Sequence, residues 1–293
     1  MNGLLEADST VEIFLSRTRH ILDNKELSSL SDADVQIQDE DGNTVTLSYL
    51  NRLYSSGDMK IEPGKSYRIT AAAQGFNDVE ATCVIPESVA MRYIDTSSSF
   101  NEWGERQLSF EIAFSDPPGE KNYYMLSLQA KVEMMHFDIV QRIDTLYIDT
   151  AKDVVITGIV NDTIKYFIPR YENVWIESED LAIEQWDYRT NNVIFSDKLF
   201  DGKEYTFNGS FYDWFLWGAT DTSTLYVKLQ SVDEHYFKYI DSREDHYYAK
   251  NDPFAVPVVV HNNIENGIGI LGGMAASVDS LKLAPMYREP YYW

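Results

Sequence analysis

The chain has few of the residues that build disulfide frameworks, metal fingers, nucleic-acid surfaces or membrane spans. Its 293 residues include one cysteine, Cys83, so an internal disulfide and the multi-cysteine zinc motifs are excluded. Only 24 basic residues oppose 47 acidic ones, and a net charge of −23 would repel a nucleic acid. No apolar run approaches the roughly 18 residues of a membrane-spanning helix. The start of the chain lacks the basic and apolar regions of a signal peptide.

Aromatic residues are abundant instead. The chain contains 20 Tyr, 14 Phe and 6 Trp, and 44% of its residues are hydrophobic. That hydrophobic share is enough to bury a substantial core. Aromatic side chains suit the half-buried surface of a sheet, so this composition favours β-structure. Cys83 lies in a mostly apolar run, and we expect it to pack as a small hydrophobic side chain.

Residues 1–88 read as one small β-sandwich. Apolar and polar residues alternate in several short runs, which is the period of a half-buried strand. Asp41-Gly42 separates two of these runs, and Gly supplies the positive φ that a tight hairpin turn demands. The last strand stops at Pro86, and residues 86–89 are the best domain boundary. The pattern predicts a small β-sandwich over residues 1–88.

Residues 89–293 predict a larger antiparallel β domain, a sandwich or barrel, with one helix. Strand patterns continue through the aromatic-rich middle of the chain. Ser231 and Glu234 match a capping box, and apolar residues then follow at helical spacing, so we predict a helix near residues 231–250. A glycine-rich strand at residues 267–278 is expected to close the second sheet. The predicted fold class is therefore all-β with two domains.

No motif of established chemistry is present in the sequence. The five histidines lack the spacing of a metal site on a helix, and Asp39 to Asn43 lacks the EF-hand order of ligands, so it reads as a hairpin turn. Gly267, Gly269 and Gly272 match G-x-G-x-x-G, but no βαβ unit surrounds them. We predict no catalytic residue, no metal and no cofactor, and a protein that is not an enzyme. Chance carboxylate pairs among 47 acids leave a hydrolase open as an alternative.

A dense aromatic cluster at residues 211–217 is the candidate ligand site. Strand alternation would point Tyr212 and Trp214 to one face and Trp217 to the other, so one set should lie outside the core. Aromatic faces bind sugar rings and peptide side chains. We predict a glycan or peptide site at Tyr212, Trp214 and Trp217, with coverage of both faces by protein as the alternative.

The order of several residue runs resembles a family of Bacteroidetes lipoproteins, domain of unknown function 4249. The most specific run is Phe-Ser-Asp-Pro-Pro-Gly-Glu-Lys-Asn-Tyr-Tyr at residues 114–124. Similar runs lie at residues 11–17, 33–47, 62–67, 84–86, 199–203, 227–231 and 267–278. The resemblance thus covers nearly the whole chain, and none of its motifs is catalytic.

The resemblance implies a lipid-anchored protein of the outer membrane or cell surface, often encoded beside TonB-dependent receptors. It also implies that the first domain, residues 1–88, is an immunoglobulin-like or transthyretin-like sandwich. Family precursors carry a signal peptide and a lipid-bearing cysteine, and neither is visible in this sequence. Cys83 lies mid-chain and cannot be the lipid-bearing residue. We therefore expect membrane association only through a lipid anchor that this sequence does not contain.

The leading hypothesis is an accessory or binding subunit of a TonB-dependent uptake system. The alternatives are a hydrolase acting on glycan or peptide and a structural or adhesive surface protein.

Overall fold

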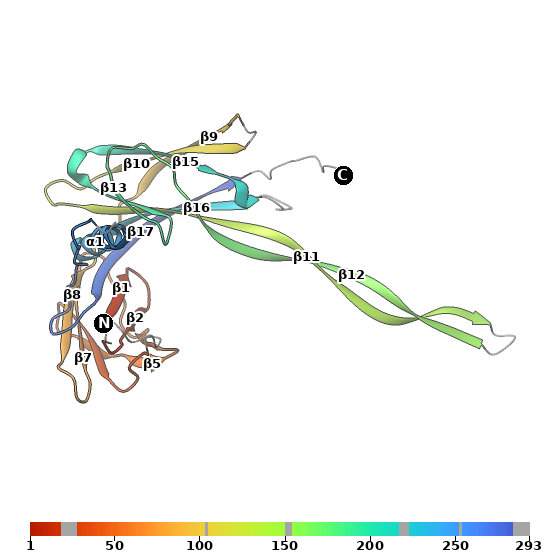
Figure 1. The fold of residues 1–293 in the computed structure, drawn as a ribbon, viewed down its shortest axis with the longest axis horizontal. Coiled ribbons are helices and arrows are strands. Elements are labelled where there is room, and N and C mark those ends of the chain that lie inside the picture. The colour runs from red at the N-terminus through yellow and green to blue at the C-terminus, as the bar shows by residue number, and fades with distance from the viewer. Residues whose placement is uncertain (19–27, 103–104, 150–153, 217–222, 252–253, 284–293) are drawn as a thin grey trace.

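A computed structural model describes residues 1–18, 28–102, 105–149, 154–216, 223–251 and 254–283. These residues form several twisted β-sheets and one α-helix, so the all-β prediction, with its sandwich-like arrangement, is confirmed (Figure 1). One β-hairpin projects far from the rest of the molecule. No helix among the described residues has both the length and the hydropathy needed to cross a bilayer.

The first part of the chain, without residues 19–27, forms eight short strands. Their bounds are β1 Asn2–Glu6, β2 Val11–Phe14, β3 Asp34–Asp39, β4 Thr44–Thr46, β5 Ser48–Leu50, β6 Leu53–Ser56, β7 Ser66–Ala72 and β8 Val79–Val84. Strands β4, β3, β7 and β8 make a four-stranded antiparallel sheet. The hairpin predicted at Asp41-Gly42 is confirmed: Gln38 pairs with Thr44, and Gly42 has a φ of 88°. Cys83 is buried in the core of this part, as expected.

The described residues of the second part form nine strands, one helix and two short 3₁₀ turns. Their bounds are β9 Met91–Phe100, β10 Arg106–Ser115, β11 Tyr123–Asp149, β12 Val154–Val174, β13 Ile183–Asp187, β14 Asn192–Ser196, η1 Asp197–Leu199, β15 Glu204–Tyr212, η2 Trp214–Leu216, β16 Ser223–Val232, α1 Glu234–Asn251 and β17 Ile270–Leu283. Strands β15, β10 and β9 form a three-stranded sheet. This sheet packs over β11, β14 and β16 around an aromatic-rich core.

The closing strand β17 links the two parts of the chain. It pairs with β16 along one edge and runs parallel to β1 along the other, with Asn2 opposite Ile270. The ten-stranded sheet therefore continues from β13 at one end to β5 at the other. Two main cores lie on this frame, one built mainly from residues 1–85 and one from residues 89–283. The division after residue 88 remains a prediction.

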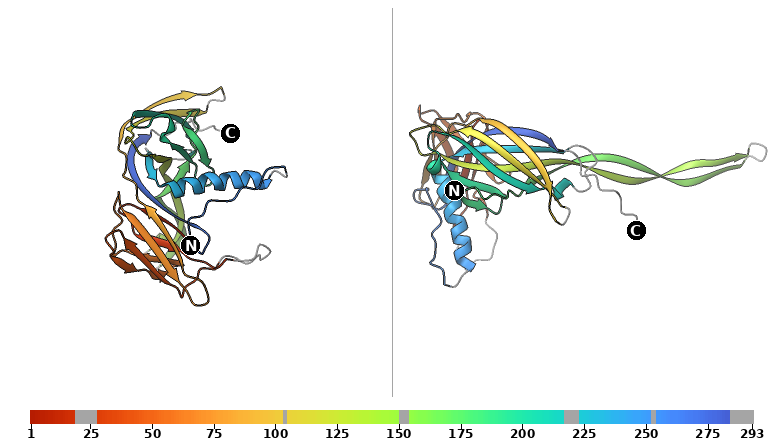
Figure 2. Two further views of the ribbon diagram at one scale, coloured as in Figure 1. Left: turned by 90° about the vertical axis from the view of Figure 1, so that its left-hand side faces the viewer. Right: turned by 90° about the horizontal axis from the view of Figure 1, so that it is seen from above.

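Helix α1 begins two residues later than its capping-box pattern indicates. Asp233, rather than Ser231, caps the helix: Oδ1 of Asp233 accepts a hydrogen bond of 2.8 Å from the backbone N–H of Tyr236. Ser231 belongs to β16, where its backbone pairs with Tyr124 and Ala275. Val232, which the capping box would make the first helical residue, is still paired with Tyr123 and Met274 in the sheet, so the helix begins only after Asp233. The helix projects sideways from the two sheet layers (Figure 2).

Candidate functional site

The predicted aromatic site is only partly assembled in the structure. Strand β15 ends at Tyr212, and the next residues turn into η2 instead of continuing the alternation. Trp214 is 63% exposed, whereas Tyr212 is half-buried. Trp217 lies outside the described residues. Strand alternation would also place Leu216 on the face of Trp214, and this is wrong: Leu216 is buried, because the 3₁₀ turn rotates it into the core.

Asp213 explains why the strand stops there. Its carboxylate is buried and pairs with the side chain of Arg106 on β10. Its carbonyl accepts a hydrogen bond of 2.8 Å from the N–H of Leu216, which closes the turn. A buried charge is tolerated only when it is paired in this way. The turn leaves Trp214 on the surface and buries Phe215 beside it.

Replacing Trp214 by alanine should leave stability almost unchanged, because its ring is already largely in water. We expect a change in unfolding free energy within about 0.5 kcal/mol. The neighbouring Phe215 is the matched control: it is buried, so Phe215→Ala should cost about 3 to 5 kcal/mol. Urea denaturation of both variants makes the comparison. A large loss of stability in Trp214→Ala would mean that this ring is buried, and it would contradict an exposed binding surface at Trp214.

The most extensive exposed feature is the projecting hairpin, which we call the arm and define as residues 132–149 of β11 with residues 154–170 of β12. Up to Lys131, β11 is flanked by β16. Beyond it, β11 pairs only with β12 among the described residues, and β12 pairs with no other strand. At about 3.3 Å per residue, the arm extends for roughly 60 Å. Figures 1 and 2 show the arm projecting away from the rest of the molecule.

Both faces of the arm carry exposed apolar side chains. On one face Met135 lies opposite Phe167, and Phe137 and Ile139 follow at two-residue intervals. Phe137 and Ile139 are 63% and 64% exposed. The opposite face exposes a second set: Val140, Ile164, Tyr166 and Ile168. Exposed apolar patches are typical of surfaces that contact another molecule.

The sequence predicted ordinary strands through the aromatic-rich middle of the chain and did not reveal the arm. Between residues 132 and 170 it offers two candidate turns, at residues 149–153 and at residues 161–163, and local patterning does not choose between them. A pair of very long strands around one turn is a two-stranded ribbon. Alternation alone does not show whether other strands flank such a ribbon.

Three aspartates lie close together where the loop at residues 116–122 meets the loop at residues 197–203. One carboxylate oxygen of each of Asp116, Asp197 and Asp201 lies within 4.8 Å of the others. Asp116 accepts hydrogen bonds from the hydroxyl of Tyr124 and from the N–H of Gly202. Burial raises the pKa of Asp116, and the neighbouring carboxylates add to this effect. These hydrogen bonds tie the two loops together, which is the role we assign to the cluster.

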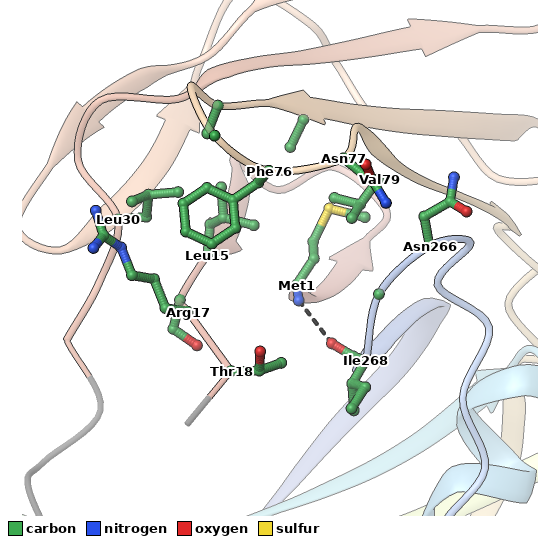
Figure 3. Close-up of a pocket in the computed structure, with 15 residues that line it drawn as sticks. Met1, Leu15, Arg17, Thr18, Leu30, Phe76, Asn77, Val79, Asn266 and Ile268 are labelled. Carbon is green, nitrogen blue, oxygen red and sulfur yellow. Dashed lines mark hydrogen bonds between the residues drawn. The ribbon is translucent and has the colours of Figure 1, made fainter. Parts of the chain in front are cut away.

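A cavity of about 360 Å³ opens at the edge of the first part of the chain (Figure 3). Leu15, Leu30 and Phe76 form its apolar wall, and the guanidinium of Arg17 lies 5.3 Å from the centre of the Phe76 ring. The amino group of Met1 donates a hydrogen bond of 2.9 Å to the carbonyl of Ile268. Loop residues line it together with Ala71 of β7 and Val79 of β8, and none of the described lining residues is a carboxylate.

The fold and these surfaces define a class: an all-β protein with a long projecting hairpin and an exposed apolar surface. The chain belongs to the family described as Domain of unknown function (DUF4249), which matches residues 1–280. A search of curated proteins finds no match. The resemblance noted in the sequence is thus confirmed at the level of the family.

Proposed function

We propose that the protein is a non-catalytic binding subunit of the bacterial cell envelope that docks onto a TonB-dependent outer-membrane receptor through its arm. One observation carries this proposal: beyond Val132 and Met134, which pack against the core, most described side chains of the arm are exposed, and its outer edges pair with no other strand among the described residues. A two-stranded hairpin alone is marginally stable in water. A protein surface that covers the arm would bury its apolar side chains and could extend its ribbon by strand pairing.

The charge distribution supports contact through the arm. The sequence from residue 131 to residue 172 contains seven acidic and five basic residues, so it carries a net charge of −2. The whole chain carries −23. The acidic and basic residues of this segment nearly cancel, so it carries little of the net charge of the chain. The acidic remainder of the chain keeps the protein soluble, and the nearly neutral arm approaches a partner with little repulsion.

The location of the protein is part of the same proposal. Members of the family that the sequence resembles are lipoproteins often encoded beside TonB-dependent receptors. A lipid anchor in the precursor would place this chain at the outer membrane or cell surface, where such a receptor lies. Glycan or peptide binding at Trp214 and Tyr212 is a secondary function, supported by the exposure of the Trp214 ring.

Photo-crosslinking from the arm tests this function. Benzoylphenylalanine in place of Phe137 should crosslink the receptor in native outer membranes. The same group in place of Leu181, which is 89% exposed but lies outside the arm, is the matched control. Mass spectrometry of the products should find the receptor only with the label at position 137. Equal products from both positions, or none from position 137, would contradict the arm as the docking element.

A double variant tests the energetic contribution of the apolar face. Phe137→Glu with Ile139→Glu places two charges where the partner should bury apolar side chains, and a buried unpaired charge is costly. We expect recovery of the receptor with the affinity-purified full-length protein to fall at least about tenfold. Leu181→Glu adds a charge outside the arm and should leave recovery unchanged. A double variant that recovers as much receptor as the wild type would exclude this face from the interface.

A further inference from the structure

Residues 254–263, which we call the strap, lie between helix α1 and the last strand β17. They form neither helix nor strand and run back alongside α1 (Figure 2). Val256 and Val259 are 81% and 88% exposed, and no residue from 254 to 261 is fully buried. Burial of apolar area therefore contributes little to holding this part of the strap in place.

Hydrogen bonds to one face of α1 hold the strap instead. The backbone N–H of His261 donates to Oγ of Ser242 over 2.8 Å. Nδ1 of His246 lies 2.7 Å from the carbonyl oxygen of Val258, and Nδ1 of His235 lies 3.1 Å from Nε2 of His261. His235, Ser242 and His246 follow one another at intervals of about two turns and one turn, so they share a face of the helix. Two of these three contacts depend on a histidine side chain.

The imidazoles of His235 and His261 share one proton. Their ring planes lie within 13° of each other, and their ring centres are 5.4 Å apart. That separation equals the 3.1 Å contact plus the distance from each ring centre to its nitrogen, so the two nitrogens lie on the line between the ring centres. The lone pair of one nitrogen therefore points at the N–H of the other. A metal ion on this line would need the nitrogens roughly 4 Å apart, so the geometry selects a hydrogen bond.

A second proton on this pair would break the contact. A neutral imidazole has one N–H and one acceptor nitrogen, whereas an imidazolium has two N–H groups. With both rings charged, two N–H groups and two positive charges would meet across 3.1 Å. His246 behaves differently, because a carbonyl only accepts hydrogen bonds and Nδ1 must already be the donor. Protonation of His246 therefore leaves its bond to Val258 intact.

The charges around the pair do not compensate a second proton. Lys238 and Glu234 of α1 both act on His261, and their charges largely offset each other because Nζ of Lys238 lies 3.0 Å from Oε1 of Glu234. From position 254 to position 264 the strand-free segment contains no Asp, Glu, Lys or Arg. Burial lowers the pKa of His261 from its ordinary value of 6.5, and His235 and Lys238 lower it further.

The docked strap thus binds a proton on His261 less tightly than a released strap would. Docking is therefore fully stable above about pH 6.5 and weakens as the pH falls below that value.

We propose that the strap is a pH-sensitive latch, docked on α1 near neutral pH and released in mild acid, when His235 and His261 both carry a charge. Release would uncover the helix face on which the strap lies. The far end of the strap stays fixed, because Ile264 is buried in the first core and the backbone of Glu265 pairs with that of Glu80. The latch does not involve the arm, so this proposal and the proposed function fail separately.

Two spin labels on the full chain test the latch. Cysteines replace the exposed Val259 on the strap and Asp245 on α1, and Cys83 is buried and should not react. Electron paramagnetic resonance should show strong dipolar coupling between the two labels at pH 7.5. Below pH 6.5 the ratio of uncoupled to coupled labels should rise by up to about tenfold per pH unit, because release takes up one proton. Equal coupling at pH 7.5 and pH 5 would overturn the proposal.

Histidine variants of the labelled chain separate the shared proton from other effects of acid. His261→Gln places an amide, which does not ionise, where Nε2 was, so the strap should stay docked at pH 5. His235→Asn replaces the other ring nitrogen in the same way and should give the same result. His246→Asn is the matched control: its amide N–H replaces the donor to Val258, and release in acid should remain. Release like that of the wild type in both His261→Gln and His235→Asn, or its loss in His246→Asn, would overturn the proposal.

Two further controls exclude other titrations. Burial raises the pKa of Asp233 to about 7, but its carboxylate caps α1 at Tyr236, so Asp233→Asn should still show release in acid. Labels at Glu111 and Asn208, which lie opposite each other on β10 and β15, should stay coupled throughout. Loss of release in Asp233→Asn would assign the transition to that carboxylate. Loss of coupling between positions 111 and 208 would mean that the whole fold loosens, and either result would overturn the latch.

Discussion

Replacing Phe195 by alanine should lower the unfolding free energy by about 3 to 5 kcal/mol. The ring is fully buried at the centre of an aromatic cluster in the core of the second part of the chain. Its centre lies 5.6 Å from that of Tyr124 and 5.7 Å from that of Phe207. These neighbours come from β11 and β15, which belong to different sheets, so the ring bridges the sandwich. Its loss removes buried area and leaves a cavity that two paired sheets cannot close.

Urea denaturation followed by far-UV circular dichroism gives the measurement. Phe100→Ala is the matched control, because the same ring on β9 is 70% exposed and its removal should change stability by about 0.5 kcal/mol or less. If Phe195→Ala lost under about 1 kcal/mol, the two sheets would not share this core. The comparison thus tests the packing that defines the second part of the fold.

Asp233→Asn should stabilise the protein, and the gain should grow with pH. Burial raises the pKa of Asp233 from 3.8 to about 7 in the folded protein. The folded state therefore binds this proton more tightly than the unfolded state. Stability from this group is fully present below about pH 4 and is lost as the pH rises toward 7. Between pH 5 and pH 8, the stability of Asp233→Asn relative to wild type should increase by roughly 2 to 3 kcal/mol.

The difference in unfolding free energy between wild type and Asp233→Asn, measured in urea at pH 5, 6.5 and 8, checks this expectation. Other titrating groups are common to both proteins and largely cancel in the difference. Asp58→Asn, at an exposed position, controls for the removal of one negative charge from a chain of net charge −23. A difference that stays constant across this pH range would mean that burial does not hold the proton on Asp233.

Local sequence was sufficient where neighbouring residues decide the conformation. Asp41-Gly42 predicted the β3–β4 turn, because the positive φ of Gly42 is a property of the residue itself. The aromatic and alternating composition predicted an all-β fold, since one buried face imposes a period of two. The same local reasoning misplaced the helix cap. Ser231 and Glu234 match a capping box, but the pairing of β16 with its two neighbouring strands keeps Ser231 in the sheet.

The candidate sites depended on contacts that no local pattern encodes. Alternation in β11 is the same whether a strand is flanked by others or projects freely, so the sequence did not reveal the arm. The aromatic cluster at residues 211–217 was visible in the sequence, but the turn after Tyr212 exposed Trp214 and buried Leu216. The sequence pattern did not predict that Asp233 is buried, because its burial arises only where distant segments of the chain meet.

By itself, the sequence determined the strand-rich composition, the hairpin turns, the presence of one helix and the strong negative charge, because each depends on residue type and short spacing. The tertiary structure decided that Asn2 pairs with Ile270, that residues 132–149 leave the sheet, and that His235 meets His261. Each of these arises from contacts between residues far apart in the chain. Their formation depends on the packing of the whole molecule, and burial and exposure follow from that packing.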